Sequence, residues 1–227
     1  MHIIAPQWNA PQYVKAFTVA HPLDEKLHAK KCSSNFKAHI KKHFQFEKEP
    51  AYLEQIHSNI VIDVDHNPQR TGDASITQSI QQPLVILTAD CLPVLITHRF
   101  NKEIANVHAG WRGLYEGVIE NTFSLLRDKP EHYMAWIGPA ICENCYEVGE
   151  NFRQNFLKKD AGFFDCFIKK KDWHFNLSHA AELILQKIGV HQIHQSHLCT
   201  FEQETLFSYR REKENASLLG TIIWLED

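Results

Sequence analysis

Short apolar runs in the middle of the chain predict buried strands. Residues 84–87 read Leu-Val-Ile-Leu, 94–97 read Val-Leu-Ile-Thr and 134–137 read Met-Ala-Trp-Ile. Runs of this length, bounded by turn residues, are typical of strands that are covered on both faces. The pattern also predicts a turn at 99–102 that leads into a returning strand over 103–107.

Helical spacing appears in the segments around these runs. The polar and basic stretch near the N-terminus predicts a helix over 35–44. Apolar residues between 114 and 126 follow helical spacing up to Lys129-Pro130, where proline is expected to end the helix. Residues 151–159 can form another helix.

A later helix carries signals at both of its ends. Asn176 suits the N-cap of a helix over 177–188, and Gly189 suits the position just after it. A final strand is expected over 221–225. No linker and no internal repeat interrupts the chain, so we predict one α+β domain over 1–227 with mixed sheets.

Composition excludes several classes of protein. The formal net charge of −3 does not predict a broad basic surface for nucleic acid. No apolar run reaches the roughly 18 residues of a membrane span. The first residues lack the features of a signal peptide, and six cysteines in 227 residues do not resemble a disulfide framework. A cytoplasmic protein is therefore expected.

His57, Cys91 and His108 are the strongest candidates for chemistry, because each lies in its own dense motif. The motifs read Gln-Ile-His-Ser at 55–58, Thr-Ala-Asp-Cys-Leu-Pro at 88–93 and His-Ala-Gly-Trp-Arg-Gly at 108–113. Two imidazoles and one thiolate suit Zn²⁺, and three protein ligands leave a fourth position for water. Single histidines and cysteines are more often packed or hydrogen-bonded. Residue chemistry alone leaves a metal site and a metal-free Cys/His site open.

Two other groups compete with this one. His191, His194 and His197 would share a face only on a helix, and Gly189 argues against a helix there, so a second metal site at these histidines is disfavoured. Cys142 and Cys145 form a C-x-x-C that does not open a thioredoxin-like helix, which favours structural cysteines. The chain has no His-x-His pair for a multicopper site, no G-x-G-x-x-G fingerprint and no P-loop.

A series of motifs from about position 55 to 211 resembles the YfiH/YlmD-like family of laccase-domain proteins. The matching segments are 55–58, 72–74 with Thr77, 88–93, 108–113, 137–141, 145–149, 199–200 and 207–211. The resemblance implies a single α+β domain of packed mixed sheets with outer helices. It also implies zinc at His57, Cys91 and His108.

Members of this family are described as purine nucleoside phosphorylases with adenosine deaminase activity. Their substrates are adenosine, inosine, guanosine and methylthioadenosine, and older labels call them copper-dependent polyphenol oxidases. Two arginines of the family pattern are missing here. The N-terminal Thr-Arg segment is not found, and the terminal Thr-Gly-Arg reads Leu-Leu-Gly at 218–220.

The leading hypothesis is therefore a zinc-dependent purine nucleoside phosphorylase with adenosine deaminase activity, whose partners are purine nucleosides and phosphate. Zinc would lower the pKa of a bound water towards about 7. Cys91, His108 and Asp90 are the catalytic candidates, with Asp90 as proton shuttle or as an orienting group. Three arginines are candidates for phosphate, and they are Arg112, Arg210 and Arg211.

Three alternatives remain open from the sequence. Copper in the same site would suit a polyphenol oxidase. A metal-free hydrolase would use Cys91 as nucleophile and His108 as base. A zinc-stabilised binding protein would have no activity. We expect a purine pocket near the zinc, lined by the turn at 108–113 and the loop at 138–139, with Trp111 either stacking on the base or lying in the core.

Overall fold

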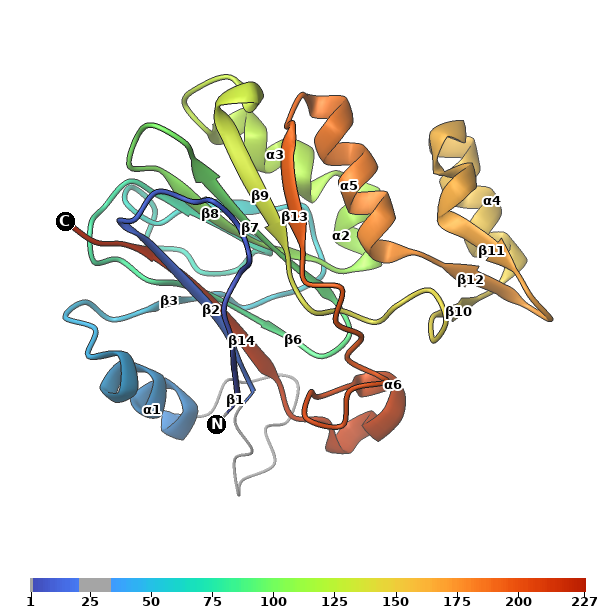
Figure 1. The fold of residues 1–227 in the computed structure, drawn as a ribbon, viewed down its shortest axis with the longest axis horizontal. Helices are drawn as coiled ribbons and strands as arrows, with labels where there is room; N and C mark the ends of the chain where they lie inside the picture. Colours follow the sequence, from blue (N-terminus) through green and yellow to red (C-terminus); the bar gives the residue numbers. More distant parts are fainter. Residues whose placement is uncertain (1, 21–33) are drawn as a thin grey trace.

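The computed structural model describes residues 2–20 and 34–227, and within them the strands form two large sheets and one small one (Figure 1). The five-stranded sheet contains, in spatial order, β1 (His2–Ile4), β2 (Val14–Ala20), β14 (Leu219–Leu225), β6 (Leu84–Thr88) and β3 (Ala51–Tyr52). The six-stranded sheet contains β13 (Gln192–Gln195), β9 (Tyr133–Ile137), β7 (Leu92–His98), β8 (Ile104–Ala109), β5 (Ala74–Thr77) and β4 (Val61–Asp63). The small sheet contains β10 (Glu147–Val148), β12 (Trp173–Phe175) and β11 (Phe167–Lys169).

The two large sheets pack face to face, and helices cover their outer faces (Figure 1). Alternate residues of β7 and β9 explain the layering. Leu95 and Trp136 point towards the five-stranded sheet, whereas Val94 and Ala135 pack under the helices. Both faces of the six-stranded sheet are thus buried, which explains why its strands are continuous apolar runs.

The helices lie on opposite sides of this sandwich (Figure 1). Helix α1 (Ser34–Phe44) packs on the five-stranded sheet. Helices α2 (Trp111–Glu116), α3 (Val118–Leu125) and α5 (Leu177–Ile188) pack on the six-stranded sheet. The remaining elements are α4 (Glu150–Lys159), α6 (Tyr209–Glu212) and the 3₁₀ turns η1 (Pro130–His132), η2 (Ala161–Cys166) and η3 (Lys213–Asn215). The expected mixed α and β fold is confirmed.

The predicted helix across 114–126 is wrong as one continuous element. Gly117 has a φ of 93°, a left-handed conformation that a right-handed helix cannot contain. Its N–H closes the end of α2 on Gly113 and Leu114, and α3 starts directly after it. The second helix already ends at Leu125, so Pro130 begins a 3₁₀ turn instead of ending the helix.

The other predicted elements are confirmed in type. The apolar runs form β6, β7, β8, β9 and β14, and α1 and α4 lie where helices were expected. The Asn176 side chain accepts a hydrogen bond from the N–H of His179, and Gly189 has a φ of 112°. The part of the polar and basic N-terminal stretch that precedes residue 34 lies outside the described residues.

Two chain crossings between the sheets bring the candidate residues to one place. The bend at 89–91 carries the chain from β6 in one sheet to β7 in the other, and Cys91 lies on it. His57 lies on the connection from β3 to β4, which makes the same crossing. His108 is opposite Pro93 in the β7–β8 pair. The fold therefore gathers three residues that are far apart in the sequence.

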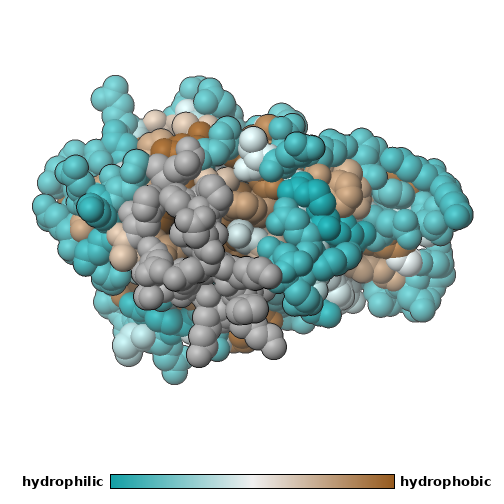
Figure 2. Space-filling model, turned by 90° about the horizontal axis from the view of Figure 1, so that it is seen from below, coloured by the Kyte–Doolittle hydropathy of each residue, from teal (hydrophilic) through white to brown (hydrophobic). Residues whose placement is uncertain are grey.

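One face of the molecule is mostly polar. Figure 2 shows a largely hydrophilic face with apolar residues visible in smaller areas between the polar ones. None of the helices in residues 2–20 and 34–227 combines the length and apolar character needed to cross a bilayer.

Candidate metal centre

The ligand atoms of His57, Cys91 and His108 lie within 4.8 Å of one another, and we call these residues the mixed cluster. The Cys91 Sγ and His57 Nε2 atoms are 3.8 Å apart. In a tetrahedral site with Zn–S of about 2.3 Å and Zn–N of about 2.0–2.1 Å, this separation is about 3.6 Å. These two donor atoms are thus already close to the spacing that an ion requires.

A buried carboxylate, Asp73, supports two of the three residues of the mixed cluster. Asp73 is fully buried, and its Oδ1 accepts hydrogen bonds from His108 Nδ1 at 2.7 Å and from the His57 N–H at 2.9 Å. Its Oδ2 accepts from the N–H and hydroxyl of Ser58 at 2.6 and 2.7 Å. The bond to Nδ1 aims His108 Nε2 at the cluster, as in carboxylate–histidine–metal arrangements. Despite burial, these hydrogen bonds lower the pKa of Asp73.

The sequence alone does not indicate a role for Asp73. Its only signal was its place in the motif Gly-Asp-Ala at 72–74. A metal-binding histidine usually donates its second N–H to a carboxylate, so a search for such a partner would have singled out acidic residues in motifs. The pairing of β5 with β8 is what brings Asp73 next to His108, and strand pairing is not visible in the spacing of residues.

The electrostatics of the mixed cluster favour a thiolate. Burial raises the pKa of the Cys91 thiol, but the charge and hydrogen bonding of His108 and His57 overcome this and lower it to about 6. Burial lowers the pKa of His108, whereas the Cys91 and Asp73 charges raise it to about 9. A thiolate and neutral imidazoles are the forms that bind metals, and an ion would take the place of the proton on His108.

Glycine at position 110 keeps space free at the donor atoms. A Cβ atom at Gly110 would lie 3.0 Å from Cys91 Sγ, 3.1 Å from His57 Cδ2 and 3.5 Å from His108 Nε2. The backbone itself is ordinary there, with a φ of −60°. Space, not conformation, therefore explains the glycine, and the residues present fit a bound ion.

A cavity of about 670 Å³ opens beside the mixed cluster. Apolar and aromatic side chains form much of its wall, together with the three candidate ligands. The lining residues are Leu53, Glu54, Gln55, Ile56, His57, Leu87, Thr88, Ala89, Asp90, Cys91, His108, Trp111, Ile141, Tyr146, Leu177, Tyr209, Arg210 and Leu218. A volume of this size and character is typical of a small-molecule site.

Comparison with known proteins identifies the family. The family model described as "Multi-copper polyphenol oxidoreductase laccase" matches residues 20–226. The chain belongs to this family. "Purine nucleoside phosphorylase YfiH" from Shigella flexneri is 36% identical, with 98% of each chain covered, and the protein of the same name from Escherichia coli (strain K12) is 35% identical over the same shares.

Solved structures agree with this assignment. A protein from Neisseria meningitidis has a TM-score of 0.89 and 28% identity, with each chain covered completely. YlmD from Geobacillus stearothermophilus has a TM-score of 0.82 at 19% identity, which shows the shared fold alone. The predicted resemblance to the YfiH/YlmD-like family is confirmed.

In this laccase-domain protein Asp90 lies at the cavity, but both of its carboxylate oxygens have partners. Oδ1 accepts a hydrogen bond from Thr200 Oγ1 and Oδ2 accepts one from the Arg210 N–H, both at 2.6 Å. Asp90 has a φ of 86°, a left-handed conformation that is costly for a residue other than glycine. These contacts support the orienting role, in which Asp90 fixes the bend that presents Cys91.

The three candidate arginines occupy different environments. Arg210 lines the cavity, where its guanidinium lies over the Tyr146 ring. The Arg211 guanidinium instead donates to the backbone carbonyls of Thr200, Phe201 and Leu206. The Arg112 guanidinium lies over the Trp111 ring and does not line the cavity. The fold thus brings one of the three to the cavity.

The histidines at 191, 194 and 197 do not form a metal group in the part of the chain that the structure describes. His194 lies in strand β13, where successive side chains point to opposite faces. His98, Asp128 and His132 do lie close together, but Nδ1 of His98 accepts hydrogen bonds from the N–H groups of Phe100 and Asn101. That group therefore holds the turn after β7.

Proposed function

We propose that this protein is a metal-dependent purine nucleoside phosphorylase that also deaminates adenosine. The observation that carries the proposal is the cavity of about 670 Å³ with His57, Cys91 and His108 in its wall. The size of the cavity suits a nucleoside. Relatives of the chain from Shigella flexneri and Escherichia coli carry the name purine nucleoside phosphorylase.

In the proposed role, His57, Cys91 and His108 hold the ion, and Zn²⁺ suits two imidazoles and a thiolate. A bound zinc ion supplies a Lewis acid and an acidified water. Asp73 keeps the His57 backbone and the His108 ring in place through hydrogen bonds of 2.9 and 2.7 Å. Removal of such a supporting carboxylate usually weakens metal binding and activity.

The apolar wall offers a binding surface for the purine base. Three aromatic residues, Trp111, Tyr146 and Tyr209, line the cavity. Trp111 also contacts Phe152 edge to face, so it is anchored to the core while one part of it reaches the cavity. Aromatic faces bind bases by stacking worth about 1–3 kcal/mol.

Phosphorolysis requires a second, anionic site. A phosphate oxygen forms a bond to C1′ of the nucleoside while the bond from C1′ to the purine nitrogen breaks, which yields ribose 1-phosphate and the free base. Arg210 is our proposed phosphate ligand because, of Arg112, Arg210 and Arg211, it alone lines the cavity. Each missing charge-assisted contact costs about 1.5–3 kcal/mol. We therefore expect weak phosphate affinity, and deamination that persists when phosphate is scarce.

The test measures adenosine turnover across a phosphate series, with adenine and inosine separated. Wild-type protein should form adenine in proportion to phosphate and inosine independently of it. Arg210→Gln should raise the phosphate KM by about tenfold to a hundredfold, whereas Arg112→Gln serves as the matched control. If metal-loaded protein forms neither adenine nor inosine, the proposal is refuted. An equal response of both variants would refute the role of Arg210.

A second candidate function rests on the donor set itself. Copper(II) binds sites of nitrogen and sulfur more tightly than Zn²⁺ does, and the matching family is described as a polyphenol oxidoreductase. Oxygen uptake with a phenol by copper-loaded and zinc-loaded protein separates the two proposals. Phenol oxidation at a rate above nucleoside turnover would favour the oxidase.

A further inference from the structure

Two pairs of potential metal ligands repeat the same short spacing outside the mixed cluster. Cys142 and Cys145 are separated by two residues, and so are Cys199 and Glu202. Paired ligands of the form C-x-x-C, brought together from distant segments, are typical of structural zinc sites. Here a carboxylate, which zinc also accepts, takes the last position.

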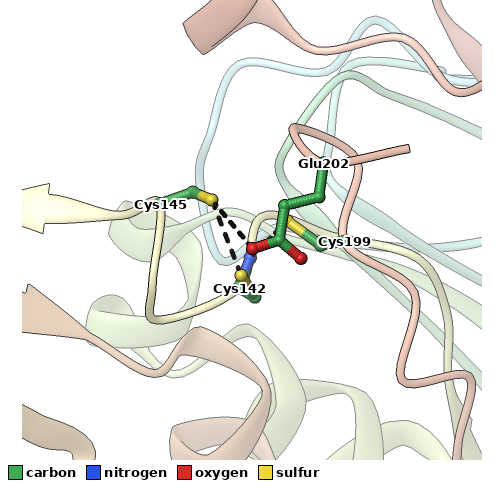
Figure 3. Close-up of side chains that lie close together, drawn as sticks. All are labelled: Cys142, Cys145, Cys199 and Glu202. Carbon is green, nitrogen blue, oxygen red and sulfur yellow. Dashed lines mark hydrogen bonds between the residues drawn. The ribbon is translucent and has the colours of Figure 1, made fainter. Parts of the chain in front are cut away.

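The fold brings these four residues together, and we call them the cysteine cluster (Figure 3). Their ligand atoms all lie within 4.8 Å of one another. In Figure 3, Cys142 and Cys145 come from one loop, and Cys199 and Glu202 reach towards them from another. Neither pair could form this cluster alone.

Two of the separations match the edges of a tetrahedral site. The Sγ atoms of Cys142 and Cys145 are 3.7 Å apart, and Cys145 Sγ is 3.6 Å from Glu202 Oε1. Around an ion with Zn–S of about 2.3 Å and Zn–O of about 2.0 Å, these distances would be about 3.8 and 3.5 Å. A disulfide would instead require an S–S distance of about 2.05 Å.

The backbone around the cysteine cluster holds the four side chains in position. The N–H of Cys145 donates to the Cys142 carbonyl, which closes a tight turn between the first two ligands. The N–H of Cys142 donates to Cys199 Sγ at 3.3 Å, so one ligand pair already stabilises a sulfur of the other. An isolated parallel bridge between Ala140 and Cys199 ties the two loops together.

We propose that Cys142, Cys145, Cys199 and Glu202 form a second metal site, which binds Zn²⁺ as a closed structural centre. Four protein ligands complete the tetrahedron and leave no position for water, in contrast to a catalytic site. Thiolate-rich sites select zinc and copper(I) over the hard cations magnesium and calcium.

The second ion would stabilise one wall of the cavity. Ile141 lies next to Cys142 and lines the cavity, and its N–H donates to the carbonyl of Asp90. Thr200 lies next to Cys199 and donates its hydroxyl to Asp90. Both loops that meet at the cysteine cluster therefore contact the bend that carries Cys91.

The test equilibrates the protein with Zn²⁺, removes the unbound Zn²⁺ and measures the number of zinc ions that remain per chain. Cys91→Ala disables the mixed cluster, so the zinc that this variant keeps reports the second site. We expect one ion to remain in Cys91→Ala and to be lost from Cys91→Ala/Cys145→Ser. Cys91→Ala/Cys166→Ala is the matched control, because Cys166 is a free thiol outside both clusters. That control should keep its zinc.

A spectroscopic readout supports the count. Replacement of zinc by Co²⁺ in Cys91→Ala should produce the near-ultraviolet thiolate-to-cobalt charge-transfer band of several Co–S bonds. Glu202→Gln, at an exposed position, should weaken zinc binding with the fold preserved by circular dichroism. None of these measurements uses a nucleoside, so the proposed enzyme function can fail without affecting this test.

Three results would overturn the second site. Cys91→Ala protein without zinc after equilibration would exclude it. Equal zinc in Cys91→Ala and Cys91→Ala/Cys145→Ser would place the ion elsewhere. A metal-free protein whose mass is lower by two hydrogen atoms, with Cys142 and Cys145 both resistant to alkylation, would indicate that these two cysteines form a disulfide instead.

Discussion

The mixed cluster and the cysteine cluster both contain cysteine thiols, but the neighbouring groups shift the thiol pKa in opposite directions. Cys91 lies between two imidazoles, and its pKa is lowered to about 6. Cys142 lies against other thiols in a partly buried loop, and burial and Cys199 raise its pKa to about 11. A thiol beside cationic groups becomes a thiolate at neutral pH, whereas a thiol beside other thiols keeps its proton until a cation replaces it.

The number of ligands differs as well. The mixed cluster has three donors in the wall of a cavity, and the cysteine cluster has four that point at one another. Three ligands leave a position for substrate or water, and four ligands do not. Chemistry is therefore expected at the first cluster and loop stabilisation at the second.

The largest expected difference between the clusters is in activity. Cys91→Ala should reduce nucleoside turnover to background while it costs only about 1–2 kcal/mol of stability. Cys145→Ser also removes a sulfur ligand, but it should lower the melting temperature more than it lowers nucleoside turnover. Turnover and melting temperature of both variants check this. Most of the activity remaining in Cys91→Ala would contradict every enzymatic role of the mixed cluster.

The next difference is in thiol reactivity after removal of metal by a chelator. At pH 7 Cys91 should be mostly thiolate and Cys142 almost entirely protonated, given pKa values of about 6 and about 11. The Cys91 thiolate is intrinsically less nucleophilic, which offsets part of its advantage in thiolate fraction. Alkylation of Cys91 should therefore be faster than that of Cys142 by about a hundredfold. Mass spectrometry of iodoacetamide-treated protein measures both rates. The Cys91 rate should level off above pH 6, while that of Cys142 still rises at pH 9.

A smaller effect is expected from Asp73, which supports only the mixed cluster. Asp73→Asn should weaken metal binding there by about 10–100-fold. Because the pKa of Asp73 is lowered, its stabilising contribution is present at neutral pH and is lost as pH falls below about 4. Chelator competition and acid unfolding measure the two effects. Asp65→Asn is a suitable control, since the Asp65 carboxylate also accepts hydrogen bonds, but from Thr77 and Gln78 and not from the mixed cluster.

The smallest expected effect comes from a single methyl group. Gly110→Ala would place its Cβ 3.0 Å from Cys91 Sγ, and overpacking of this kind costs about 1–3 kcal/mol. We expect a loss of zinc affinity at the mixed cluster of no more than about tenfold, with an unchanged cysteine cluster. Gly149→Ala, where nothing lies within 4 Å of the added atom, should leave both unchanged. Equal zinc affinity in the two variants would contradict the placement of the ion.

The sequence by itself determined the strand runs and both ends of α5. Apolar runs and capping residues act within a few positions of the chain, so 84–87, 134–137, Asn176 and Gly189 could be interpreted locally. Dense motifs also pointed to His57, Cys91 and His108, whose side chains the fold brings together.

Only the tertiary structure decided which distant groups meet. The β5–β8 pairing brings Asp73 to His108, and the bridge between Ala140 and Cys199 brings two ligand pairs into one cluster. The same fold places Arg210 in the cavity and directs Arg211 to backbone carbonyls, although the two are neighbours in sequence. Spacing along a chain encodes local conformation, whereas the partner of a charged or sulfur-containing side chain depends on strand order and loop paths that spacing does not specify.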